Sequence, residues 1–155
     1  MKKWGFFLAI LVAIGLFGGR NTPGTDISRL EPAQTVRIGQ FNGYVTVETD
    51  TGAWGMGGDL DAAIKNMNDT ANGQVFLETA EFLVVCAEMT HLIPTAADYL
   101  RPSCGLCVEA GQTDMVQVGR FLQNHDPAVT LQDYLAGLTD LPTLLTTQEG
   151  MLLVH

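Results

Sequence analysis

An uncharged N-terminal segment sets the strongest limit on how this chain can fold. Lys2 and Lys3 precede a run from Trp4 to Gly19 that contains no charged residue. A positively charged start followed by an apolar stretch is typical of an export signal. We therefore expect residues 1–19 to stand apart from the folded body, and the body to lie outside the cytoplasm.

The sequence leaves open whether this segment is a cleaved signal peptide or an N-terminal membrane anchor. Cleavage favours small residues at the last and third-from-last positions. A cut after Gly18 or Gly19 would place Leu16 or Phe17 at the third-from-last position. A spanning helix needs roughly 20 apolar residues, with a lower limit near 17, so residues 4–19 are slightly short. The two lysines favour a cytoplasmic N-terminus.

The body that follows is acidic. Beyond residue 19 the chain has six basic residues against 17 acidic ones, a net charge of −11. Such a surface repels nucleic acid and anionic lipid headgroups, so we expect no nucleic-acid partner. Residues 20–34 are polar and contain Pro23 and Pro32, which predicts a linker. Residues 35–155 have the length of a single domain with one core.

Helical and strand patterns alternate along that domain. Asn42-Gly43 between two β-rich runs predicts a hairpin. Leu60, Ala63, Ile64 and Met67 have the spacing of one helix face. The patterns predict strands at 35–39, 44–49, 75–77, 82–86, 104–109, 141–145 and 151–154, and helices beginning near residues 59, 94, 113 and 130. We predict an α+β (mixed α/β) fold with one mixed sheet packed against about four helices.

The glycine-rich run 52–58 can be interpreted in two ways. Between a strand and a helix it could hold a phosphate group. It lacks a Lys-Ser/Thr pair and a full GxGxxG motif, and Asp59 and Asp61 follow it. We expect a structural turn with Asp59 as the helix cap, and no cofactor.

Cys104 and Cys107 form a CxxC motif, which can be redox-active at the start of a helix. The residues after it are typical of a strand, in which positions three apart point to opposite faces. Cys86 ends an apolar run and is expected to be buried and inert. The histidines lack the spacing of metal ligands, and we expect no metal.

Phe41, Tyr44, Trp54 and Met56 surround the first hairpin and the glycine run. They could form an exposed surface for a partner protein, or they could be core residues. Catalytic signals are weak, because the chain has only two serines, Ser28 and Ser103, and no GxSxG motif. The acidic residues show no pairing typical of a glycosidase. We expect a non-catalytic protein with no catalytic residues.

Four segments in a fixed order resemble one protein family. They are GGDLDAAIKNM at 57–67, FLVV at 82–85, ADYLRP at 97–102 and LCVEAG at 106–111. Over about residues 35–120 the chain resembles the N-terminal region of the C subunits of spore germinant receptors, which are exported, membrane-attached proteins of spore-forming bacteria. The resemblance implies a non-enzymatic protein with a membrane-protein partner in a receptor complex.

The family carries a lipid on a cysteine at the end of its export signal, and its chains are much longer. Glycine stands where that cysteine would be, at Gly18 or Gly19. No lipid can attach there, so we expect the apolar segment itself to hold the membrane.

The sequence thus predicts a non-catalytic, exported, membrane-associated domain that acts by protein contact. The alternatives are an exported thiol-disulfide protein that uses Cys104 and Cys107, and an exported hydrolase without a recognisable motif.

Overall fold

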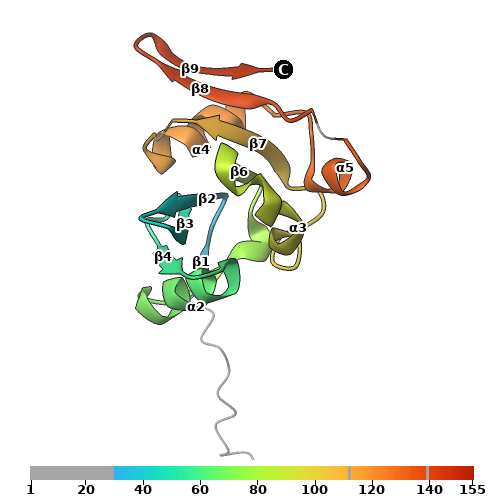
Figure 1. Ribbon diagram of the computed structural model, residues 1–155. Coiled ribbons are helices and arrows are strands. Elements are labelled where there is room, and N and C mark those ends of the chain that lie inside the picture. The colour runs from blue at the N-terminus through green and yellow to red at the C-terminus, as the bar shows by residue number, and fades with distance from the viewer. Residues whose placement is uncertain (1–29, 112, 139) are drawn as a thin grey trace, which may run out of the picture.

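The computed structural model describes residues 30–111, 113–138 and 140–155. Within them the chain forms a mixed seven-stranded sheet and four α-helices (Figure 1), which confirms the predicted α+β fold. The proposed signal or anchor at residues 1–19 lies outside the described residues. None of the helices in the described part of the chain is both long enough and apolar enough to cross a membrane.

The seven-stranded sheet has the order β4-β3-β2-β6-β7-β8-β9. Four neighbouring strands, β2, β6, β7 and β8, run parallel, and an antiparallel strand or pair extends the sheet at each end. The strands are β2 (Thr35–Phe41), β3 (Tyr44–Thr49), β4 (Trp54–Gly57), β6 (Phe82–Cys86), β7 (Gly105–Ala110), β8 (Thr143–Thr147) and β9 (Gly150–Val154).

The predicted hairpin between β2 and β3 is confirmed. Asn42 and Gly43 both have positive φ, 50° and 83°, and the strands pair from Phe41 opposite Tyr44. A two-residue turn of this kind matches the twist of the flanking strands. The turn therefore fixes which side chains of β2 and β3 share a face.

A separate two-stranded parallel sheet joins β1 (Leu30–Pro32) to β5 (Gln74–Phe76). Strand β1 lies within the stretch 20–34, for which the sequence predicted a linker. Ala33, just after it, is completely buried. The chain therefore packs onto the domain a few residues before position 35.

Helix α2 (Leu60–Thr70) begins as expected. The Asp59 side chain accepts a hydrogen bond from the Ala62 amide at 2.8 Å and caps the helix. The predicted stripe of Leu60, Ala63, Ile64 and Met67 is buried against the sheet. This side of the sheet is called the α2 face below.

The prediction of a loop over residues 52–58 is wrong for its second half, because residues 54–57 form the edge strand β4. The glycines have a packing role there. A Cβ atom on Gly57 would lie 2.4 Å from the Ala63 backbone nitrogen, so only glycine permits α2 to pack this closely. Two α2 side chains also bind the strand's backbone: Asn66 accepts from the Met56 amide at 3.0 Å, and Thr70 donates to the Trp54 carbonyl at 3.4 Å.

The remaining helices are short, and most begin near the predicted positions. The four-residue helix α3 (Ile93–Ala96) follows the 3₁₀ helix η3 (Ala87–Leu92). Thr95 and Asp98 have the spacing of a capping box, but the cap that this spacing predicts is wrong, because Thr95 lies inside the helix. The remaining elements are η2 (Leu77–Thr79), α4 (Met115–Asn124), capped by Asp114, and α5 (Leu131–Leu135), capped by the capping box of Thr130 and Asp133.

Two apolar clusters lie on opposite sides of the sheet. The larger one joins the α2 face to α2, α3 and α5. On the other side, called the α4 face, Val118 and Leu122 of α4 pack on Val84, Cys107 and Leu144. Figure 1 shows α4 on this side of β6 and β7. Helix α4 reaches the start of β2, where Gly119 lies against Thr35. It does not extend over the rest of β2 or over β4, so within the described residues the part of this face that carries Gly39, Phe41, Tyr44 and Trp54 is left without a helix.

Proline usually confines a strand to a sheet edge, and the edge position that Pro142 would predict for residues 141–145 is wrong. Strand β8 pairs with β7 on one side and with β9 on the other. Pro142 precedes the strand, where it needs no amide proton, and its carbonyl accepts a hydrogen bond from the Val108 amide at 2.9 Å. The edge strand is β9.

The glycines at the start of α2 give a matched test of close packing. Gly57→Ala should lower the free energy of unfolding by about 1–3 kcal/mol, because the new methyl group meets the α2 backbone. Gly58 has open space around its Cβ position. Gly58→Ala should therefore leave stability unchanged or raise it by up to about 1 kcal/mol. Urea unfolding of both variants checks this, and equal destabilisation would contradict it.

Candidate functional site

Side chains of β2, β3 and β4 gather on the uncovered part of the α4 face. Residues directly opposite each other in an antiparallel pair point to the same side. The register places Phe41 opposite Tyr44, and Glu48 between Arg37 and Trp54. Thr46 likewise lies between Gly39 and Met56. All of these residues therefore share one face.

The four residues suggested by the sequence as a partner surface, Phe41, Tyr44, Trp54 and Met56, are brought together on this face. The side chains of Phe41, Tyr44 and Trp54 are 58%, 51% and 46% exposed, and Met56 is half-buried. They are not core residues. These four residues are called the aromatic surface below.

A cleft of about 280 Å³ opens beside these residues. The floor of the cleft is formed by Gly39, which has no side chain, and Thr46, which has a small one. The row of Arg37 and Glu48 flanks it on one side, and the row that begins with Phe41 flanks it on the other. Trp54 and Cys86 also line it. This space is called the aromatic cleft.

An ion pair is buried at one side of the cleft. Arg37 is 4% exposed and Glu109, on β7, is 2% exposed. Arg37 Nη2 donates to Glu109 Oε1 at 3.0 Å, and Nε lies 2.8 Å from Oε2. That second contact is a charge attraction without a hydrogen bond, since neither atom has a hydrogen-bond partner.

Further contacts tie this pair to the surrounding elements. Arg37 Nη1 donates to Glu48 Oε2 at 3.0 Å, and Nη2 also donates to the carbonyl of Thr113. Glu109 Oε1 accepts from the Thr113 amide at 3.1 Å. A buried charge needs such a set of partners, since desolvation is otherwise costly. The network therefore fixes β2, β3, β7 and the segment before α4 relative to one another.

Sequence reasoning missed this pair, although it left a signal. Arg37 lies between Val36 and Ile38 in a strand that is buried on both faces, and Glu109 follows Val108 in a second buried strand. A single charge of each sign in two such strands indicates a buried pair.

Cys86 ends β6 and lines the cleft with a free, half-buried thiol. Burial raises the pKa of this thiol most, Glu109 and Glu88 raise it further, and Arg37 opposes them. Cys86 is thus held as a neutral thiol at neutral pH, which is a poor nucleophile. Nothing in this arrangement activates it.

Cys104 and Cys107 are both free and completely buried. Cys104 belongs to the cluster on the α2 face and Cys107 to the cluster on the α4 face. Burial raises the pKa of each thiol to about 12. The two thiols are inaccessible and lie on opposite sides of the sheet. This arrangement disfavours thiol-disulfide exchange, which needs an accessible thiolate.

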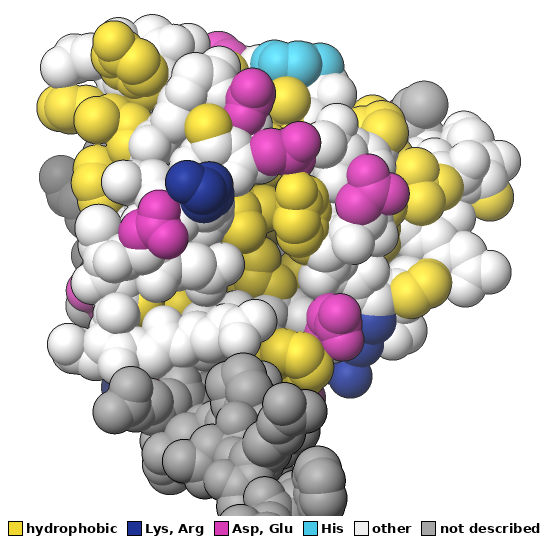
Figure 2. Space-filling model, turned by 90° about the horizontal axis from the view of Figure 1, so that it is seen from below, with side chains coloured by type: hydrophobic (Ala, Val, Ile, Leu, Met, Phe, Trp, Pro, Cys, Tyr) yellow, Lys and Arg dark blue, Asp and Glu magenta, His cyan; other side chains and the backbone are white. Residues whose placement is uncertain are grey.

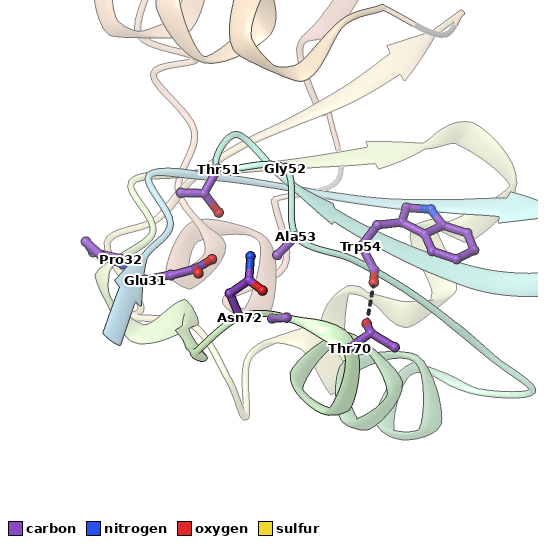
Figure 3. Close-up of a pocket in the computed structure, with 9 residues that line it drawn as sticks. Glu31, Pro32, Thr51, Gly52, Ala53, Trp54, Thr70 and Asn72 are labelled. Atoms are coloured by element: carbon purple, nitrogen blue, oxygen red, sulfur yellow. Dashed lines mark hydrogen bonds between the residues drawn. The ribbon is translucent and has the colours of Figure 1, made fainter. Parts of the chain in front are cut away.

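A larger hollow of about 620 Å³ lies at the edge of the domain between β1, β4 and the end of α2. Figure 3 shows Glu31, Thr51 and Asn72 pointing toward one another there. The Trp54 side chain points away, and only its carbonyl meets Thr70. This hollow is wide, its polar side chains are exposed or half-buried, and no buried charge lies in it. The aromatic cleft is therefore the better candidate site.

No family model, curated protein or solved structure matches this chain. Within the described residues, no group of three His, Cys, Asp or Glu side chains is placed to hold a metal ion. The functional argument therefore rests on the geometry of the aromatic surface and the cleft.

The buried pair gives one test. Glu109→Gln should lower the free energy of unfolding by about 3–5 kcal/mol, because it leaves the buried Arg37 short of a countercharge. Glu48→Gln is the matched control, because the Glu48 side chain is 36% exposed, and should cost about 1 kcal/mol or less. Chemical denaturation of both variants measures the difference. Similar losses would show that the deeper burial of Glu109 does not make its carboxylate more important for stability than that of Glu48.

The thiols give a second test. In the native protein, Cys86 should react slowly with a thiol reagent such as Ellman's reagent, because its thiol is only half-buried but has a raised pKa. Cys104 and Cys107 should react only on unfolding. Their burial and raised pKa both oppose reaction. Cys86→Ser should abolish the native reaction. A native Cys104–Cys107 couple with a potential of roughly −120 to −270 mV would contradict this expectation.

Proposed function

We propose that this chain is a non-catalytic, exported and membrane-associated domain that acts by binding another protein through the aromatic surface. The observation that carries the proposal is the exposure of Phe41, Tyr44 and Trp54 on a single face of the sheet. Single exposed apolar residues are common, but a contiguous patch indicates an interaction site. Tyrosine and tryptophan are also the residues that most often dominate binding energy at protein interfaces.

The rigidity of the support favours the same function. The three aromatic residues stand on paired strands, and the Arg37–Glu109 pair fixes these strands against β7. A preformed surface loses little conformational freedom on binding. This arrangement suits recognition of a partner better than catalysis, since the Cys86 thiol in the cleft is held neutral.

Export and membrane association rest on the sequence. Lys2 and Lys3 precede the uncharged residues 4–19, which are suited to direct or hold the N-terminus at a membrane with the body on the extracytoplasmic side. The resemblance to the C subunits of spore germinant receptors supports a membrane protein of a receptor complex as the partner. The thiol-disulfide alternative has less support, because Cys104 and Cys107 are buried on opposite faces.

Cell fractionation tests the membrane part of the proposal. The protein should sediment with membranes and resist extraction by high salt, because residues 4–19 are apolar and lack a good cleavage site. N-terminal sequencing of the recovered protein should find Met1 or Lys2. A soluble exported species that starts near Arg20 would show that the segment is a cleaved signal.

Crosslinking tests the contact surface. A photoreactive amino acid in place of Tyr44 should give one discrete crosslink to a membrane protein, which mass spectrometry identifies. Binding of that purified partner should then weaken at least about tenfold with Trp54→Ala, the magnitude expected when an interface aromatic is truncated. Leu152→Ala is the control, because Leu152 is 54% exposed on the distant strand β9. Equal binding by both variants would exclude the aromatic surface.

A further inference from the structure

The charges beside the aromatic cleft do not balance. The buried Glu109 already matches the charge of Arg37 at close range. Glu48 then adds a second carboxylate, and its side chain is 36% exposed at the cleft. Among the described residues only Arg37 donates a hydrogen bond to it, through Oε2. The site therefore carries one negative charge in excess, and part of its hydrogen-bonding capacity is free.

An aromatic ring stands next to this carboxylate. Trp54 lies directly opposite Glu48 in the β3–β4 register, which puts their Cβ atoms about 4.5–5.5 Å apart. A cation bound there would gain from the carboxylate and from the face of the indole, the best aromatic partner for a cation. Phe41 lies across the cleft and offers an apolar wall to the stem of a long side chain.

Apart from Arg37, the charged residues that line the cleft or act on Cys86 are acidic. Glu88 lies close enough to Cys86, at the end of the cleft, to affect its titration, as does Glu109. The exported body carries a net charge of −11. In the view from below the domain, acidic side chains are spread over the surface and basic ones are few (Figure 2). Such a field attracts cations over a distance and repels anions.

An anion is a poor occupant for local reasons as well. Arg37 is the cationic residue that lines the cleft, but it is 4% exposed and its guanidinium is bound to Glu109, Glu48 and the Thr113 carbonyl. An anion would also meet Glu48 at the entrance. The volume of about 280 Å³ lies at the lower limit of small-molecule sites, which suits one long side chain.

We infer that the aromatic cleft binds a lysine or arginine side chain of the partner protein, with the cation between Glu48 and Trp54. The apolar residues beside that cation contact Phe41 and Tyr44. This inference rests on the proposed protein-binding function and names the chemistry that the partner must present there.

Short peptides test the inference on the full chain in detergent micelles. The probes are acetyl-Leu-Arg-Leu-amide and the same peptide with citrulline, an uncharged isostere, in place of arginine. A Trp4→Phe background leaves Trp54 as the single tryptophan, so its indole NMR signal reports binding. The arginine peptide should shift this signal and bind about tenfold or more tightly than the citrulline peptide. Its affinity should fall as salt rises.

Variants locate the effect. Glu48→Gln should weaken the arginine peptide about tenfold, whereas Glu149→Gln, which removes an exposed carboxylate at the β8–β9 turn, should not. Trp54→Leu keeps an apolar side chain without a π face and should also weaken binding, as read from backbone amide signals of β3. It is the second variant if Glu48→Gln is unstable.

Three results would overturn the inference. They are equal binding of the arginine and citrulline peptides, equal loss with Glu48→Gln and Glu149→Gln, and no binding of either peptide. The Tyr44 crosslink and its dependence on Trp54 are measured separately. If they persist in any of these cases, protein contact stands and only the basic side chain is excluded.

Discussion

The buried attraction between Arg37 and Glu109 is the interaction on which the arrangement of this domain depends. The two residues are 72 positions apart in sequence and lie on β2 and β7, with β6 between them. Thr113 adds the segment that leads into α4. Two charges in such a place are tolerated only in a fixed geometry with several hydrogen bonds. The positions of the hairpin, the central strands and α4 are therefore coupled.

The same pair separates two environments on the α4 face. On one side of it, α4 covers Val84, Cys107 and Leu144 with its apolar stripe. On the other side, the small residues Gly39 and Thr46 lie between charged and aromatic rows. The apolar stripe of α4 packs on the apolar part of the sheet, and the charged row of Arg37 and Glu48 lies beyond it. The cleft therefore opens on the part of the face that α4 does not cover.

The sequence correctly predicted the features that depend on residues close together along the chain. The Asn42-Gly43 turn, the Asp59 cap and the buried stripe of α2 each rely on residues a few positions apart, and each is found in the structure. Strand β4 was not predicted. Its two glycines, Gly55 and Gly57, are typical of a loop in the sequence. Only the structure shows that they are needed because α2 packs directly on them.

Prediction of the site was incomplete for the same reason. The aromatic residues could be suggested because they cluster near one hairpin in the sequence. Whether they were exposed depended on where α4 lies, and no local pattern specifies that. The partners of Arg37 come from β3, β7 and the segment before α4, and a single sequence does not show which distant strands become neighbours.

The two edges of the sheet differ in what they offer to another strand. On β4, Asn66 and Thr70 of α2 occupy the Met56 amide and the Trp54 carbonyl. On β9, Leu152 and Val154 are exposed, and in the described part of the chain no strand pairs along its outer side. An added strand would need free backbone groups, so within the described residues β9 is the more suitable edge for one. Growth at β9 would leave the aromatic cleft, at the opposite end of the sheet, open to its own partner.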